Sequence, residues 1–139
     1  MKYTAVFDTN ILLSALLSQN GNPFRCLALA KIGQVESITC EEILNEFTEK
    51  LLIKFKFSEE ATQSVVEEVR RLSCLVSISK TLKVVPDDAD DDMVIECAVN
   101  DNATHIVTGD KHLLSLTNYQ NIAIVKASEF IALHREPSS

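Results

Sequence analysis

The sequence predicts an α/β fold, a three-layer sandwich in which a mostly parallel central sheet is flanked by helices. Two observations predict it. Short apolar runs typical of buried strands alternate along the 139 residues with longer segments of helical periodicity. The chain also has only three Gly and three Pro, which is too few for a turn-rich all-β protein. Strands separated by helices pair in parallel through right-handed crossovers, so helices are expected on both faces of the sheet.

Strands are expected wherever a short run is rich in β-branched or aromatic residues. These runs cover residues 3–7, 35–38, 105–107 and 122–125, and a further short strand is expected between residues 75 and 85. The segment 50–57 is compatible with either a helix or a strand.

Helices are expected between these strands, and several carry start or stop signals. Asn22 before Pro23 is a typical helix start, Thr39-x-x-Glu42 has the form of a capping box, and Gly33 is a typical stop. The expected helices cover 11–17, 23–32, a stretch from residue 39 onward, 59–72 capped by Ser58, a stretch after the acidic run 87–92 to residue 99, 111–116 and 127–134.

Length and charge limit the function classes. A chain of 139 residues is expected to form one domain over residues 1–135, with a frayed tail at 136–139. The net charge of −7 excludes a global attraction to nucleic acid, so nucleic-acid chemistry would need local basic patches or a bound metal. Four cysteines without a C-x-x-C pair predict free thiols in the cytoplasm, and no apolar run is long enough for a membrane span.

Carboxylates follow two of the predicted strands. Asp8 comes directly after the first strand, and Asp110 follows the strand at 105–107. Parallel strands end at the same sheet edge, where ligands of α/β proteins bind, so these two acids are expected to converge. Asp92 lies in the first turn of the helix that precedes the second of these strands.

The helix after residue 39 offers a fourth acid. Its candidates are Glu41, Glu42, Glu46 and Glu49. At 100° per residue, Glu46 lies nearest the edge of the apolar arc and is favoured over the other three.

Several carboxylates at one site predict a bound cation. Two unit charges about 4 Å apart repel by roughly 4 kcal/mol at an effective dielectric of about 20. Oxygen-only ligands favour Mg²⁺ or Mn²⁺, which can orient water and neutralise charge on a phosphate. Each acid also has a purely structural alternative: Asp8 as a helix cap, 90–92 as partners of the helix dipole, Asp110 as a turn residue and Glu46 as a solvated charge.

Four segments resemble, in order, the motifs of the PIN-domain nucleases. They are Val6–Asn10, Glu41–Glu46, Asp92–Ala98 and Ile106–Lys111, and they span nearly the whole chain. The acidic positions of this family fall on Asp8, Glu46, Asp92 and Asp110. The chain is most similar to small bacterial and archaeal members of the VapC-type toxin group.

The resemblance implies an Mg²⁺- or Mn²⁺-dependent endoribonuclease in which Asp8, Glu46, Asp92 and Asp110 are catalytic and bind the metal. It further implies a homodimer that cuts RNA and is silenced by an antitoxin protein. Asn10 and Thr108 match positions that support the acids by hydrogen bonds, and Asp90 is an accessory acid. Many relatives have another Asp where this chain has His112.

Other functions remain open at this stage. A PIN nuclease of this kind could act in RNA processing or on DNA, or the fold could bind RNA without cutting it. A receiver-like Mg²⁺-binding module would need an acidic pair after the first strand, and Asp8 has no acidic neighbour. A dehalogenase-type phosphatase would need Asp-x-Asp there, where this chain has Asn10.

Overall fold

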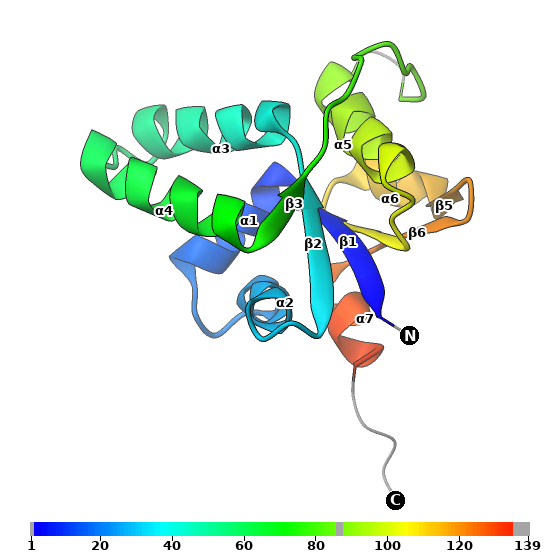
Figure 1. Cartoon of the computed structure of the whole chain (residues 1–139), viewed down its shortest axis with the longest axis horizontal. Coiled ribbons are helices and arrows are strands. Elements are labelled where there is room, and N and C mark those ends of the chain that lie inside the picture. Colours follow the sequence, from blue (N-terminus) through cyan, green and yellow to red (C-terminus); the bar gives the residue numbers. More distant parts are fainter. Residues whose placement is uncertain (1, 86–87, 135–139) are drawn as a thin grey trace, which may run out of the picture.

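A six-stranded sheet forms the centre of the computed structural model, which describes residues 2–85 and 88–134 (Figure 1). The strand order is β3-β2-β1-β4-β6-β5. Every neighbouring pair is parallel except β5 and β6, which are antiparallel. The strands are β1 (Tyr3–Phe7), β2 (Val35–Thr39), β3 (Ser73–Leu75), β4 (His105–Val107), β5 (Asn118–Tyr119) and β6 (Ile122–Val125).

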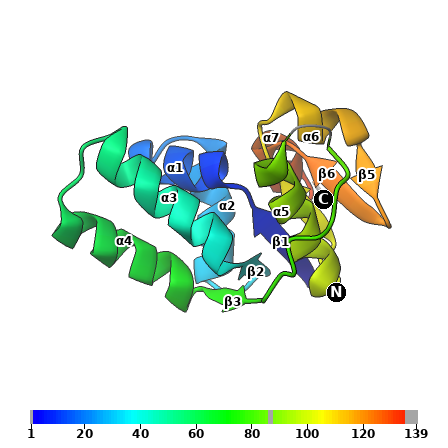
Figure 2. The same ribbon diagram turned by 90° about the horizontal axis from the view of Figure 1, so that it is seen from above.

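Helices cover both faces of this sheet, which confirms the predicted α/β sandwich (Figures 1 and 2). On one side α1 packs against α2, α2 packs against α7, and the α3–α4 pair extends this layer. On the other side α5 lies across β1, β2 and β4, and α6 packs on β6. The helices are α1 (Thr9–Leu17), α2 (Asn22–Lys31), α3 (Glu41–Ile53), α4 (Glu59–Arg71), α5 (Ala89–Asn100), α6 (Lys111–Leu116) and α7 (Ala127–Ala132).

The central strands are buried on both sides, as expected for parallel strands between two helical layers. Val6, Phe7 and Ile106 are almost fully buried, and Phe130 of α7 packs edge-to-face on Phe7. This rigid centre fixes the carboxyl ends of β1 and β4, where Phe7 is in register with Val107.

Two local predictions are wrong at the ends of elements. The capping box at Thr39 does not form, because β2 continues through Thr39, which pairs in register with Leu75, and α3 begins after Cys40. Glu42 instead forms an ion pair with Lys80 at 3.4 Å. In α2, Asn22 is the first helical residue rather than the cap, which is Gly21.

The remaining differences concern short or ambiguous segments. In the segment 50–57 the helix α3 continues to Ile53 and then ends. The strand expected between 75 and 85 lies earlier, at 73–75, and β5 was not expected. The predicted tail at 136–139 lies outside the described residues. Across the described ranges, every helix is too short or too polar to cross a membrane.

Candidate active site

Asp8 lies at the carboxyl end of β1 and caps α1. Its Oδ1 accepts a hydrogen bond from the amide of Ile11 at 3.0 Å, and its Oδ2 accepts one from the Thr108 hydroxyl. The side chain is buried, which raises the pKa of Asp8. The hydrogen bonds from Thr108 and Ile11 oppose this rise, whereas the nearby charge of Asp110 adds to it. The ends of β1 and β4 therefore hold Asp8 firmly beside a second carboxylate.

Asp110 reaches the same place from the end of β4. Its own amide donates to Thr108 Oγ1 at 3.0 Å, and its Oδ1 accepts from the amides of His112 and Leu113 at 2.7 and 3.2 Å. Thr108 thus contacts Asp8 through its hydroxyl proton and Asp110 through its oxygen lone pairs. This single buried side chain sets the spacing of two acids that are about a hundred residues apart in sequence.

The start of α5 brings two further carboxylates to the group. Asp88 caps the helix by accepting from the Asp91 amide at 3.2 Å. Asp91 is only 7 % exposed, and its Oδ2 has no hydrogen-bond partner among the described residues. Burial, followed by hydrogen bonding to Asp88 and the charge of Asp110, raises the pKa of Asp91 to about 8. Asp91 therefore retains a proton near neutral pH unless a cation takes its place.

Glu46 of α3 forms the opposite wall. Burial raises the pKa of Glu46, the Thr9 hydroxyl lowers it, and hydrogen bonding to Asp90 raises it again. Together these side chains surround a hollow of about 120 Å³, called the acidic hollow below. Its lining residues are Asp8, Thr9, Asn10, Glu46, Lys50, Asp88, Asp90, Asp91, Val94 and Asp110.

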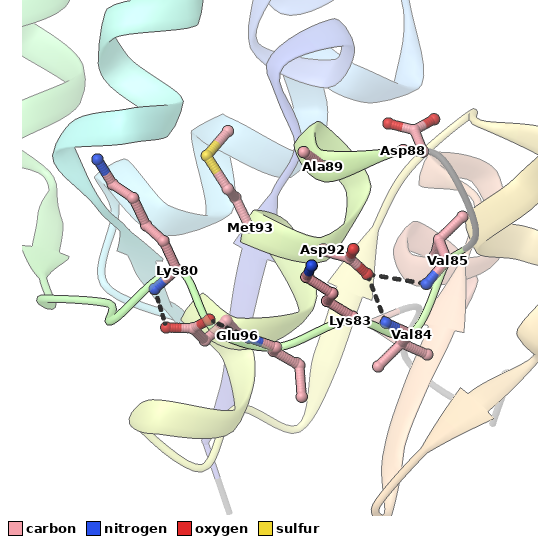
Figure 3. Close-up of a pocket in the computed structure, with 10 residues that line it drawn as sticks. Lys80, Lys83, Val84, Val85, Asp88, Ala89, Asp92, Met93 and Glu96 are labelled. Atoms are coloured by element: carbon pink, nitrogen blue, oxygen red, sulfur yellow. Dashed lines mark hydrogen bonds between the residues drawn. The ribbon is translucent and has the colours of Figure 1, made fainter.

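Of the four acids predicted from sequence, Asp92 does not join this group. Its Oδ1 accepts from the amides of Val84 and Val85 at 2.7 and 2.8 Å. Figure 3 shows its carboxylate turned toward these residues, beside a separate hollow of about 540 Å³. Consecutive residues of a helix point about 100° apart, so Asp91 and Asp92 cannot face the same site. Of these two neighbours, Asp91 lines the acidic hollow and Asp92 lines the separate one.

The supporting residues also have distinct positions. Thr108 bonds directly to Asp8, as described, whereas Asn10 is exposed and its Oδ1 accepts from Lys50 Nζ at 3.4 Å. Asp90 is exposed at the rim of the acidic hollow, next to Glu46. The side chain of Asn10 therefore orients Lys50, whereas its backbone hydrogen-bonds to Asp8 and lowers the pKa of that acid.

Sequence reasoning did not single out Asp88 and Asp91, and left His112 without a role. His112 Nδ1 lies 3.7 Å from Asp88 Oδ2. One ligand atom from each of Asp88, Asp91, Asp110 and His112 falls within 4.8 Å of the others. A signal for Asp91 was present, because it precedes the buried Val94 and Ile95 by three and four positions and so shares their face. For His112, an exposed residue in the first turn of α6, the only signal was the departure from the Asp that many relatives have at this position.

The composition of the site suits a hard divalent cation. Mg²⁺ and Mn²⁺ prefer carboxylate oxygens, which dominate the acidic hollow. A buried carboxylate oxygen needs a proton, a donor or a cation, and no donor among the residues described reaches Asp91 Oδ2, whose neighbours are the carboxylates of Asp88 and Asp110. The residues present therefore fit such a cation: Asp88, Asp91, Asp110 and His112 bring ligand atoms within 4.8 Å of one another, and Asp8 and Glu46 line the same hollow.

Comparisons with known proteins identify the family and the fold of this chain. A protein-family model described as "PIN domain" matches residues 4–112. An uncharacterized protein of Methanocaldococcus jannaschii, MJ1680, is 31% identical over 120 residues, which are 84% of this chain and 76% of that protein. A chain in the crystal structure of VapBC2 from Rickettsia felis, bound to a DNA fragment from their promoter, has a TM-score of 0.61 and 17% identity. That match covers 87% of this chain and 96% of the other, and shows a shared fold.

Proposed function

This chain belongs to the PIN-domain family, and we propose that it is an endoribonuclease that hydrolyses RNA phosphodiester bonds with Mg²⁺ or Mn²⁺. The observation that carries the proposal is the acidic hollow itself. Carboxylates from β1, α3, α5 and the end of β4 meet there, and one of them keeps a buried oxygen without a partner among the described residues. Because the chain belongs to this family, we do not retain the receiver-like module or the dehalogenase-type phosphatase as alternative functions.

We assign the metal-holding role to Asp8, Asp91 and Asp110, with Asp88 and Glu46 in support. A divalent ion held there would polarise a water molecule and offset the negative charge that develops on the phosphate. Asp91 takes the role that sequence motifs gave to Asp92, because it is the residue of α5 that lines the acidic hollow. Asp90 stays an accessory acid at the rim.

The protein's own groups would orient the reaction and move the proton. Thr108 keeps Asp8 and Asp110 at a fixed spacing, so the scissile phosphate meets a preformed site. Glu46 lines the hollow and has a raised pKa, so it is a better proton acceptor for the attacking water than an ordinary glutamate. The ammonium group of Lys50, held by Asn10, can pair with a substrate phosphate.

The substrate class follows from the size and charge of the site. The acidic hollow is narrow, and its walls repel phosphates that no cation offsets. An unpaired strand can present one phosphodiester to such a hollow more readily than a duplex can, which favours single-stranded or looped RNA. Lys50 and the exposed Lys111 are the nearest basic groups for neighbouring phosphates.

We further propose that the enzyme is the toxin of a toxin–antitoxin pair, acts as a homodimer and is held inactive by an antitoxin protein. The shared fold with a chain of VapBC2 supports this assignment. Induced expression of the wild-type chain should then arrest growth, and Asp8→Asn should not. A small open reading frame directly before the gene, whose product restores growth, would identify the antitoxin.

The activity is tested with end-labelled single-stranded RNA, duplex RNA and single-stranded DNA in Mg²⁺, Mn²⁺ or EDTA. We expect cleavage of the single-stranded RNA only with metal, and a loss of about 100-fold or more in Asp8→Asn and Asp110→Asn. Asp101→Asn is the matched control, because it removes one exposed acid from the far end of α5. Full cleavage by Asp8→Asn would refute the assignment, and preferential cutting of DNA would overturn the choice of RNA.

A further inference from the structure

Two carboxylates of α5 are used for a different purpose from those in the acidic hollow. Residues 79–85, called the strap here, lie along α5 without joining the sheet (Figure 3). Asp92 Oδ1 accepts hydrogen bonds from the amides of Val84 and Val85. One turn further along the helix, Glu96 accepts bonds from the other end of the strap.

Glu96 uses both of its oxygens. Oε2 accepts from the Ser79 hydroxyl at 3.0 Å and from the amides of Ser79 and Lys80, and Oε1 accepts from the amides of Thr81 and Leu82 at 3.1 Å each. Burial raises the pKa of Glu96, but these donors outweigh it and the net shift is downward. Hydrogen bonds from neutral donors to an ionised acceptor are short and strong, so the strap is firmly held.

Backbone hydrogen bonds connect the strap to Asp88 of the acidic hollow. The Asp88 amide donates to the Val85 carbonyl at 3.3 Å, and the Asp92 amide donates to the Asp88 carbonyl at 3.2 Å. Asp92 therefore accepts hydrogen bonds from Val84 and Val85 with its side chain and donates one to Asp88 with its backbone amide. Asp88 in turn caps α5 at Asp91 and faces His112.

From this geometry we propose that Asp92 is a positioning residue: by holding Val84 and Val85 it fixes Asp88 and Asp91 at the acidic hollow, and it does not bind the metal itself. Glu96 secures the preceding part of the strap. Asp92 is buried, and its Oδ1 is already committed to two backbone donors. In its consequence for catalysis the proposal rests on the proposed function, whereas its hydrogen bonds can be tested without any activity.

Two substitutions at the same position separate positioning from metal binding. Asp92→Asn keeps an Oδ1 that can accept from both amides, but it removes the charge that a metal ligand needs. Asp92→Ala removes the acceptor. If Asp92 positions the strap, Asp92→Asn keeps metal affinity and cleavage within a few-fold of wild type. Asp92→Ala should weaken Mn²⁺ binding by about 10-fold or more, as loss of a group that orients a ligand does.

Three measurements on the full chain carry the test: Mn²⁺ titration by calorimetry, cleavage against Mn²⁺ concentration, and hydrogen exchange at the amides of Val84 and Val85. We expect these two amides to exchange faster in Asp92→Ala only, with the loss of cleavage partly recovered at high Mn²⁺. Asp8→Asn is the reference for a lost ligand, and Asp101→Asn is the control for a lost charge on α5.

Each other outcome has a clear meaning. Loss of Mn²⁺ binding and cleavage in Asp92→Asn equal to that in Asp8→Asn, with the two amides still protected, would show a ligand and overturn the proposal. Unchanged Mn²⁺ binding in a folded Asp92→Ala would overturn it as well. A wild-type chain that binds Mn²⁺ but cuts no RNA would sink the proposed function alone, because amide exchange and Mn²⁺ titration would still decide the role of Asp92.

Discussion

The strongest energetic consequence of the acidic hollow concerns Asp91. Its pKa of about 8 stands roughly four pH units above the ordinary 3.8 of an aspartate. The folded protein therefore holds the proton of Asp91 more tightly than the unfolded chain does. The stability that this proton contributes is complete below pH 3.8 and is lost as the pH rises toward 8.

The magnitude follows from the proton linkage. Each pH unit between the two pKa values costs up to about 1.4 kcal/mol, so the whole interval could cost about 6 kcal/mol. Since the acidic hollow opens to solvent, we expect a smaller cost of roughly 1–3 kcal/mol. Asp91→Asn has a similar shape and no proton to lose. Without metal, this variant should therefore gain stability relative to wild type as the pH rises from 5 to 8.

Urea denaturation in EDTA at pH 5 and pH 8 measures this difference. Asp101→Asn, which removes an exposed acid, should change the free energy of unfolding by less than about 0.5 kcal/mol. Mn²⁺ should then stabilise wild type more than Asp91→Asn, because a ligand that binds only the folded state raises its stability. A stability difference between Asp91→Asn and wild type that is equal at both pH values would refute the reasoning about Asp91.

Three further predictions concern the strap, the site and the start of β4. Glu96→Gln should lower the free energy of unfolding by about 1–3 kcal/mol, because one of the two oxygens that accept from strap amides becomes an NH2 group, which cannot accept. A smaller loss of stability than that of Asp92→Asn in urea denaturation would contradict this. Thr108→Val should reduce cleavage by about 10-fold, since it removes the hydroxyl between Asp8 and Asp110, and unaltered kcat and Mn²⁺ dependence would speak against that role. Burial, and then the charge of His134, lowers the pKa of His105. The unfolded chain therefore binds a proton at this histidine more readily than the folded protein, and the fold should lose stability as the pH falls below about 6.5. His105→Phe should lose less stability than wild type between pH 7 and pH 5, and an equal loss in both would exclude His105 as the cause.

The convergence of Asp8 and Asp110 could be predicted from sequence because it depends only on strand order. Once two parallel strands are neighbours, the residues just beyond them meet at one edge. The register that pairs Phe7 with Val107 brings this about. The position of Glu46 could be predicted for a similar reason, since the apolar arc of its helix determines which side faces the protein.

The start of α3 could not be predicted, because pairing between strands decided it. Thr39 and Glu42 have the spacing of a capping box, but Thr39 is kept in β2 by pairing with β3. The strap was equally hidden, because its amides are satisfied by side-chain carboxylates of α5, the helix that follows it in the chain. Nothing in the local sequence 79–85 shows where these donors find their partners.

The run Asp90-Asp91-Asp92 shows why a motif alone gives an uncertain register. Successive residues of a helix point about 100° apart, so three adjacent acids face three different surroundings. Asp90 lies at the rim beside Glu46, Asp91 faces Asp88 and Asp110, and Asp92 holds the strap. An alignment with the family motif alone allows any of the three acids to be the one in the acidic hollow. The helical position relative to the buried Val94 and Ile95 selects Asp91. The acidic residues of this chain therefore include Asp92 and Glu96, whose carboxylates hold the strap by hydrogen bonds. Removing these acceptors should lower the stability of the fold, whereas neutralising Asp91 should raise it.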